Sequence, residues 1–338
     1  MTATVALAGD TMLGRDVARV LEADPAAPLV APDVAERAAA ADTFVLNLEC
    51  CISARGARFP DPRKAFFFRA PPIAAERLAE LGVDAVSLAN NHALDYGPEA
   101  LLDTLAHLEA AGVGSVGAGR DEATAREPRV LPGGDLRVRL VALSDHPSAH
   151  AAAPDRPGIA YADLDDGLPE WARKAAGPGP DADAVLVTPH WGPNMVGAPI
   201  RRVRRAAEAL AAAGATLVAG HSAHVFHGAA AGVLFDLGDF LDDYAIHREL
   251  RNDLGLLWLV ELDASGPRRI RALPLALDHC FTRAANPDET QAILRLLRAR
   301  CAPFGTEVTT SDGLVELLPS TLGASPTPSP GGATRRSL

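Results

Sequence analysis

The chain has few cysteines, no long apolar run and no excess of positive charge, and each of these absences excludes a class of protein. Its 338 residues include four cysteines, and two of these, Cys50 and Cys51, are adjacent. Four cysteines are too few for a disulfide scaffold, and an adjacent pair suits neither an ordinary disulfide nor a zinc knuckle. We therefore expect the four thiols to be buried or to play no part in function.

Membrane spans and binding to large polyanions are excluded in the same way. The sequence has no run of about 18 uncharged apolar residues, so we expect no membrane span. Its formal charge of −11 and its pI near 5.4 argue against nucleic acid or anionic membrane as a partner. A small anionic substrate would have to be held locally, by metal or by a few arginines.

The first ten residues lack the basic n-region of a signal peptide. They read as the first core strand of a cytoplasmic protein. The sequence gives no indication of the oligomeric state.

Strand-like and helix-like segments alternate along the chain. Strands are predicted at 5–8, 43–48, 85–88, 138–143, 184–188, 216–219, 232–236 and 256–262. Helices are predicted at 17–22, 34–40, 73–81, 99–111, 200–213 and 289–299. This alternation indicates a layered α/β fold, with a mixed sheet or two packed sheets.

Surface connections are predicted at 147–157 and 177–181. The stretch from Pro319 onward is rich in proline, serine and glycine, which predicts a disordered tail over 319–338. The remainder, 1–318, is predicted to form a single domain.

A short polar turn follows the predicted strand 85–88. It reads Ala89-Asn-Asn-His92-Ala-Leu-Asp95-Tyr-Gly97, and a leucine-rich helix comes after it. Because α/β proteins place their chemistry at the carboxyl ends of strands, Asn91, His92 and Asp95 are candidate site residues. Taken alone, the segment is also compatible with an ordinary turn.

Polar side chains end four other predicted strands as well. Asp10 follows the first strand and Glu49 follows the second, close to Asn47. Two later strands end in histidines, namely His190, His221 and His224. Taken alone, these residues also have structural interpretations. Asp10 could form a turn or cap a helix, His190 could be a core histidine, and His221 with His224 could begin a solvated helix.

Five strand ends carrying carboxylates, an amide and imidazoles together favour a pair of divalent cations. The chemistry typical of such a pair is two-metal hydrolysis, in which the ions lower the pKa of a shared water and clamp the substrate oxygens. His92 need not be a ligand, because a carboxylate three residues later suits it to general acid catalysis. The other histidines lack this placement, and five of them are interpreted as structural: His107, His146, His150, His247 and His279. His227 follows His224 by three residues and is the nearest of the rest to the site, but it is not counted among the ligands.

Seven motifs occur in order along the chain: Gly9-Asp10-Thr-Met-Leu-Gly-Arg15, Asn47-Leu-Glu49, Lys64-Ala-Phe-Phe-Phe-Arg69, Asn91-His92-Ala-Leu-Asp95, His190-Trp-Gly192, Gly220-His221-Ser-Ala-His224 and Phe235-Asp-Leu-Gly-Asp-Phe240. Together they resemble one family, the CapA or poly-γ-glutamate capsule synthesis family of the calcineurin-like metallophosphoesterase superfamily. The resemblance runs in the family's order from about residue 4 to 242. The Asn91–Gly97 segment is also similar to a motif of 5′-nucleotidases.

The resemblance implies a four-layer α-β-β-α sandwich with metals at the strand ends. It implies catalytic roles for His92 and Asp95. It implies two divalent ions (Mn, Zn or Fe), with these ligands: Asp10, Glu49, Asn91, His190, His221 and His224. It also makes Arg15, Lys64 and Arg69 candidates for binding an anionic substrate group.

The chain departs from the superfamily pattern at several positions. Met12 stands where the superfamily has a histidine ligand, and Glu49 stands where it often has Asp. Asp239 replaces the family's usual Asn. The final His-x-His is lengthened to His221-x-x-His224.

The function expected from sequence is metal-dependent hydrolysis of a phosphate ester of a small metabolite. The same residues would also suit hydrolysis or transfer at a γ-glutamyl-type amide. A third interpretation is a non-catalytic assembly factor for polymer synthesis that keeps the metal fold as a binding module. Retention of both His92 and Asp95 favours an enzyme.

Overall fold

Strand β1 (Ala3–Thr11) runs through the middle of the larger of the two main sheets, which two small two-stranded sheets accompany. The computed structural model describes residues 1–318, so the predicted tail 319–338 lies outside the described residues. The strand order of the larger sheet is β19-β20-β17-β16-β1-β2-β5-β6, with β15 beside β1 and β18 beside β17. The bounds of these other strands are β2 (Thr43–Leu48), β5 (Ala85–Ser87), β6 (Gly114–Val116), β15 (Asp239–Leu241), β16 (Leu254–Asp263), β17 (Gly266–Asp278), β18 (Phe281–Ala284), β19 (Glu307–Ser311) and β20 (Leu314–Leu318).

The smaller sheet has the order β13-β14-β12-β11-β9-β8. Its strands are β8 (Arg129–Gly133), β9 (Leu136–Ser144), β11 (Ala184–His190), β12 (Leu217–Ala219), β13 (Ala229–Ala230) and β14 (Val233–Leu234). Strands β9, β11, β12 and β14 are parallel, as are β1, β2, β5 and β6 in the larger sheet. The smaller sheet therefore has a parallel centre with an antiparallel strand at each margin, whereas in the larger sheet the parallel strands form one half, out to the edge strand β6, and the antiparallel strands form the other.

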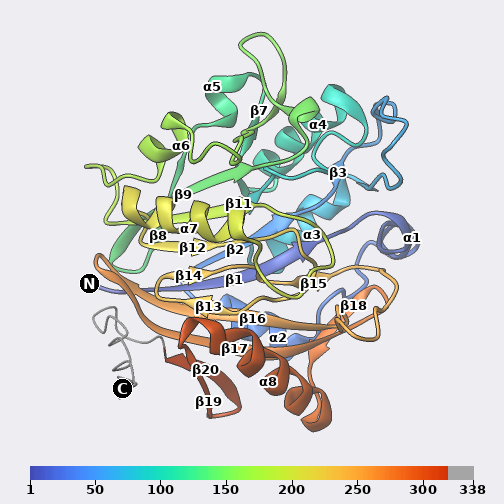
Figure 1. Ribbon diagram of the computed structural model, residues 1–338. Coiled ribbons are helices and arrows are strands. Elements are labelled where there is room, and N and C mark those ends of the chain that lie inside the picture. Colours follow the sequence, from blue (N-terminus) through green and yellow to red (C-terminus); the bar gives the residue numbers. More distant parts are fainter. Residues whose placement is uncertain (319–338) are drawn as a thin grey trace, which may run out of the picture.

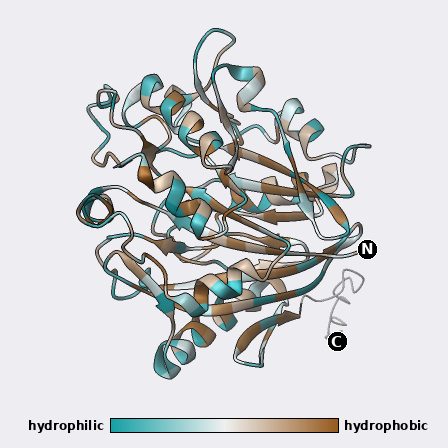
Figure 2. Cartoon of the chain, turned by 180° about the vertical axis from the view of Figure 1, so that it is seen from behind, coloured by the Kyte–Doolittle hydropathy of each residue, from teal (hydrophilic) through white to brown (hydrophobic). Residues whose placement is uncertain are grey.

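The two sheets pack face to face through a shared apolar core. Leu7 of β1, Val138 of β9 and Trp258 of β16 belong to this one cluster of buried side chains. Because apolar residues occupy both faces of the central strands, these strands read as continuous hydrophobic runs in the sequence. In Figure 2 the strands are coloured mainly as hydrophobic, and many of the outer turns are coloured as hydrophilic.

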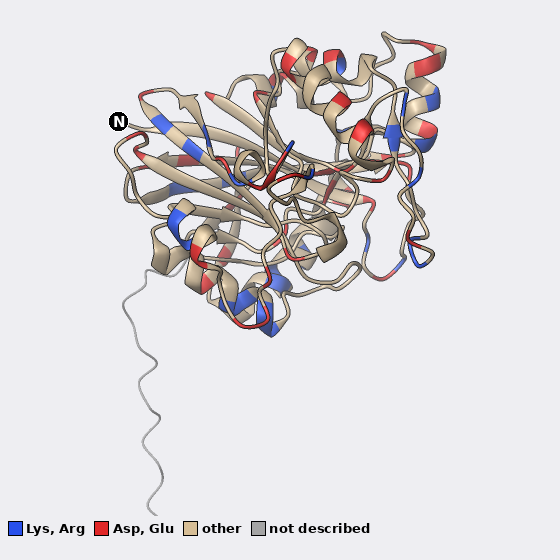
Figure 3. Cartoon of the chain, turned by 90° about the horizontal axis from the view of Figure 1, so that it is seen from above, with Lys and Arg blue, Asp and Glu red and all other residues tan. Residues whose placement is uncertain are grey.

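Helices cover the outer faces of the two sheets (Figure 1). Helices α1 (Arg15–Ala23), α2 (Pro32–Ala39), α3 (Ile73–Glu80) and α4 (Gly97–Ala110) pack against the larger sheet. On the smaller sheet lie α6 (Glu170–Ala175) and α7 (Arg201–Ala213). The helices carry charged residues of both signs (Figure 3). The expected four-layer α-β-β-α sandwich is confirmed.

Helix α8 (Pro287–Cys301) packs against the antiparallel part of the larger sheet, beside β17 and β19. Asn286 caps its first turn by accepting from the backbone N–H groups of Asp288 and Glu289, which satisfies donors that a helix start leaves unpaired. Short elements complete the fold: β3 (Cys51–Ile52), β4 (Arg69–Ala70), β7 (Ala118–Gly119), β10 (Gly158–Ile159) and α5 (Glu122–Ala125).

Each predicted strand and helix is present, with its bounds shifted by a few residues at most. The antiparallel strands after β16 and the short helices α5 and α6 were not predicted. The predicted connection at 147–157 contains a single 3-10 turn, Ser148–His150. None of the helices within residues 1–318 combines the length and apolar character that crossing a bilayer requires.

Candidate metal centre and the adjoining cavity

Asp10 occupies the centre of the candidate site, at the carboxyl end of β1. The chain is tightly packed there, since a Cβ on Gly9 would lie 1.8 Å from the carbonyl oxygen of Gly238. The Asp10 backbone N–H donates to that same carbonyl at 2.9 Å. The pairing of β1 with its neighbours is irregular at this point. Glycine at position 9 therefore allows β15 to approach and fixes the place of the Asp10 carboxylate.

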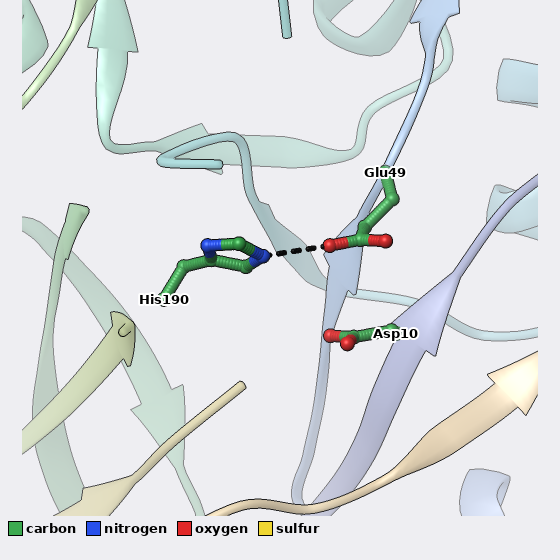
Figure 4. A group of neighbouring side chains, drawn as sticks. All are labelled: Asp10, Glu49 and His190. Carbon is green, nitrogen blue, oxygen red and sulfur yellow. Dashed lines mark hydrogen bonds and ion pairs between the residues drawn. The ribbon is translucent and has the colours of Figure 1, made fainter. Parts of the chain in front are cut away.

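One group of potential ligands consists of Asp10, Glu49 and His190, whose ligand atoms all lie within 4.8 Å of one another (Figure 4). Glu49 comes directly after β2 and His190 ends β11, so the group joins the two sheets. The Glu49 Oε1 and His190 Nε2 atoms lie 2.8 Å apart. Glu49 Oε2 and His190 Nδ1 are buried without a hydrogen-bond partner. Buried polar atoms left without partners are costly, and a bound cation would satisfy the carboxylate oxygen.

A second group shares Asp10 and adds His224 and Asp239. His224 Nδ1 lies 2.8 Å from Asp239 Oδ1 and 3.4 Å from Asp10 Oδ2. Asp239 Oδ2 is also buried and unpartnered. Asp10 thus belongs to both groups, and the donors are the carboxylates and imidazoles that divalent cations of the first transition row accept. The residues present fit divalent metal ions.

The electrostatics of the carboxylates also favour a cation. Burial raises the pKa of Glu49 well above its usual range, and the charge of Asp10 raises it further. Burial likewise raises the pKa of Asp239, with a second contribution from the charge of Asp242. For Asp10, burial acts upward, but the hydrogen bond and charge of His221 lower its pKa. A bound cation would stabilise the ionised form of all three.

Burial lowers the pKa of His190 well below its usual value, and the nearby His146 lowers it further. The neutral imidazole is therefore the favoured form, and it is the form that binds metal.

Two further expected ligands, His221 and Asn91, belong to neither group. His221 Nδ1 is 3.1 Å from Asp10 Oδ1, while its Nε2 is 2.8 Å from the Thr188 hydroxyl. Asn91 Oδ1 is buried and has no partner. The preceding Asn90 is fully engaged, since its Nδ2 donates to Asn47 Oδ1 and its Oδ1 accepts from the His92 N–H. Of the two neighbouring asparagines in this turn, Asn90 holds the backbone through its hydrogen bonds. The side-chain oxygen of Asn91 is left without a hydrogen-bond partner.

His92 and Asp95 form the expected pair. His92 Nδ1 lies 2.7 Å from Asp95 Oδ2, which also accepts from the Phe68 backbone N–H at 2.6 Å. Lys64 Nζ is 2.8 Å from the other oxygen of Asp95. The Phe68 ring covers the imidazole, with ring centroids 4.2 Å apart. Burial lowers the pKa of His92, and the charge of Asp95 only partly offsets this.

The three residues expected to bind an anionic group lie in three different environments. Arg15 lines a cavity and pairs with Asp243 at 3.1 Å. Lys64 is engaged with Asp95 and with the carbonyl oxygen of Asn91. Arg69 lies over the ring of Tyr96, 4.2 Å from its centroid, and is not among the residues that line the cavity.

The cavity has a volume of about 470 Å³. His92 and His224 both line it, so the His92–Asp95 pair and the second ligand group open onto the same space. Its size is that of a small-molecule site. Three non-glycine residues at its wall, Arg15, Met195 and His224, have positive φ angles of 51°, 54° and 59°. Such backbone conformations are strained and are often found at functional sites.

Sequence reasoning missed one pair beside the first ligand group. His146 Nδ1 lies 2.5 Å from Asp145 Oδ1, and its ring centroid is 5.0 Å from that of His190. The other Asp145 oxygen accepts from the Gly192 N–H and pairs with Arg202. A signal was available, because Ser144-Asp145-His146 ends β9 in the same way that His190 ends the neighbouring parallel strand β11.

The chain is similar in sequence to proteins of one bacterial family. The model of a family described as bacterial capsule synthesis protein PGA_cap matches residues 4–244. A probable polyglutamine synthesis accessory protein of Mycobacterium tuberculosis is 33% identical, over 83% of this chain and 78% of the relative. The PGA biosynthesis protein CapA of Bacillus subtilis is 27% identical, over 70% of this chain and 62% of the relative.

Solved structures resemble the chain more distantly. A phosphatase from Mycoplasma pneumoniae superposes with a TM-score of 0.48 at 13% identity, covering 86% of this chain and 97% of that one. A hypothetical protein from Thermus thermophilus gives 0.46 at 19% identity, covering 80% and 98%.

Proposed function

The chain belongs to the bacterial capsule synthesis protein family PGA_cap, and from this membership and its site we propose that it is a metal-dependent hydrolase acting on a phosphate ester of a small metabolite. The observation that carries the proposal is the position of Asp10. Its carboxylate belongs to two groups of buried ligands, and the second group opens onto the cavity that His92 also lines. A metal site and a candidate proton donor thus face one space.

The proposed ligands are Asp10, Glu49, Asn91, His190, His221 and His224, with Asp239 added by the structure. Two divalent ions bound there would supply a water of lowered pKa and a clamp for anionic oxygens. The unpartnered oxygens of Glu49, Asn91 and Asp239 support this assignment.

His92 is proposed to give a proton to the leaving oxygen. Asp95 accepts from Nδ1 and so directs Nε2 of the same ring away from the carboxylate. Lys64 and the Phe68 N–H hold Asp95 in place, and Arg15 is the proposed contact for an anionic group at the cavity wall.

A second candidate is favoured by the names of the relatives, which refer to polyglutamine and PGA synthesis. The same residues would serve hydrolysis or transfer at a γ-glutamyl-type amide, or metal-dependent binding by a non-catalytic assembly factor. The His92–Asp95 pair at the cavity supports an enzyme, since a binding module has no need of a proton donor.

We also propose that residues 1–318 form one domain. Pairing of β1 with β16 and of β17 with β20 supports this, because the larger sheet joins both ends of the described chain.

The decisive experiment has two steps. The purified protein is first loaded with Mn²⁺ or Zn²⁺ and its metal content is measured, with close to two ions per chain expected. It is then assayed on phosphomonoesters, phosphodiesters and γ-glutamyl amides. Turnover of phosphate esters supports the proposal, and turnover of amides alone supports the second candidate. A protein that binds neither metal would contradict both enzymatic proposals.

A further inference from the structure

Apolar and aromatic side chains form much of the cavity wall, beside the histidines that face the same space. Phe66, Phe68, Met195, Tyr244 and Ile246 all line it. Two of them, Phe66 and Ile246, expose 60% and 61% of their surface. Large apolar side chains exposed together at the mouth of a cavity typically mark a binding surface.

The aromatic rings continue outward from the proposed proton donor. Phe68 lies over His92, and Phe66 is stacked beside Phe68 with centroids 6.4 Å apart and planes inclined by 22°. Tyr244 lies 5.8 Å from Phe68 and 5.3 Å from His224, measured between ring centroids. A substrate group attached to an ester bond beside His92 would therefore contact the aromatic side chains of Phe66, Phe68 and Tyr244.

Positive charge is scarce on the same wall. Arg15 is the one Lys or Arg side chain among the residues that line the cavity in the described part of the chain. Its guanidinium lies 5.7 Å from the Phe68 ring centroid and 5.8 Å from that of Tyr244, and it also pairs with Asp243. A long polyanion would find few cations here, whereas one anionic group joined to an apolar body would match the wall.

We infer that the substrate of this site carries a flat apolar group directly beside its metal-bound anionic group. The inference rests on the proposed function, and it adds the chemical character of the substrate group that is attached to the anionic group. Ring faces would pack against that group, and Arg15 would lie at its edge.

Equilibrium binding of two phosphonates to the metal-loaded protein tests the inference without turnover. Phenylphosphonate and methylphosphonate share the anionic group and differ in the ring. Titration calorimetry should show phenylphosphonate binding about tenfold more tightly or better, because the ring buries apolar area against Phe66 and Phe68. Phe66→Ala should reduce this preference about threefold or more and leave methylphosphonate binding unchanged. Leu102→Ala, which removes a similarly exposed apolar side chain from α4, serves as the matched control.

The outcomes separate the inference from the proposed function. Equal binding of the two phosphonates, or a preference that survives both Phe66→Ala and Ile246→Ala, overturns the inference while the metal site stands. If neither phosphonate binds the metal-loaded protein, the anion site itself is absent, and the proposed function falls together with the inference.

Discussion

Asp10 and Asp239 lie opposite each other on the paired parallel strands β1 and β15. Two buried carboxylates in register repel one another, and neither can be solvated by bulk water. The imidazole of His224, within 3.4 Å of both, offsets part of this repulsion. The arrangement explains why a cation is the expected occupant, since it would stabilise both carboxylates.

Replacing Asp10 should remove metal from both ligand groups, because each contains its carboxylate. We expect Asp10→Asn to lose most of the bound metal, as measured by elemental analysis after loading and desalting. Asp155→Asn, which changes an exposed aspartate in a loop, should retain the wild-type content. An Asp10→Asn protein that is folded and fully loaded would contradict the shared role.

Replacing His92 should separate metal binding from turnover. His92→Gln keeps a polar side chain of similar reach but has no acidic proton to give. Metal content should be unchanged, while kcat on the best phosphate ester falls by about 10²- to 10⁴-fold. If the variant kept wild-type kcat, His92 would not be the proton donor.

The two arginines should differ in their effect on substrate binding. Arg15→Ala removes the cation at the cavity wall and should raise KM about tenfold, with a smaller change in kcat. Arg69→Ala removes a side chain that lies over Tyr96 outside the lining, and its KM should stay close to that of the wild type. Equal increases for the two variants would show that the cavity is not where the anion binds.

His150 should make the fold sensitive to acid. Its ring is buried, and burial together with the charge of Lys64 lowers the pKa to about 4. Because the unfolded chain binds this proton below about 6.5 and the folded chain does not, stability falls as the pH drops from about 6.5 to 4. The loss from this group alone is about 3 kcal/mol at most.

Urea unfolding at pH 7 and pH 5 measures this effect. His150→Leu should reduce the dependence of unfolding free energy on pH without abolishing it, because burial lowers the pKa of His227 to about 4 as well. The control His107→Leu, which replaces a half-buried residue of α4, should leave the dependence unchanged. A His150→Leu protein with the wild-type slope would exclude His150 as the source.

Much of the site could be predicted because each residue follows a strand that is apolar on both faces. Asp10, Glu49 and His190 were found in this way, and the structure brings them together in one group. The His92–Asp95 pair was predicted from spacing within one turn and is present in the structure.

What the sequence did not reveal depends on contacts between distant segments. Asp239 was noted as a departure from the family motif, but its place in the second group depends on the pairing of β15 with β1, more than 200 positions earlier in the chain, which no local pattern encodes. Lys64 pairs with Asp95 through a loop conformation that periodicity does not predict, and its expected contact with the substrate stays a prediction. The edge strand β19 and its neighbour β20 were missed because buried and exposed residues alternate only weakly along them.

The origin of the ligands in two different sheets has a mechanical consequence. The ligands come from both sheets: Asp10 and Glu49 lie at strands of the larger sheet, and His190 lies on the smaller one. The distances between their ligand atoms would therefore change if one sheet slid over the other. The packed core between the sheets, which includes the fully buried Trp258, resists such sliding because close-packed side chains interlock. Damage to that core far from the cavity would therefore appear first as poor metal affinity, before the fold itself gives way.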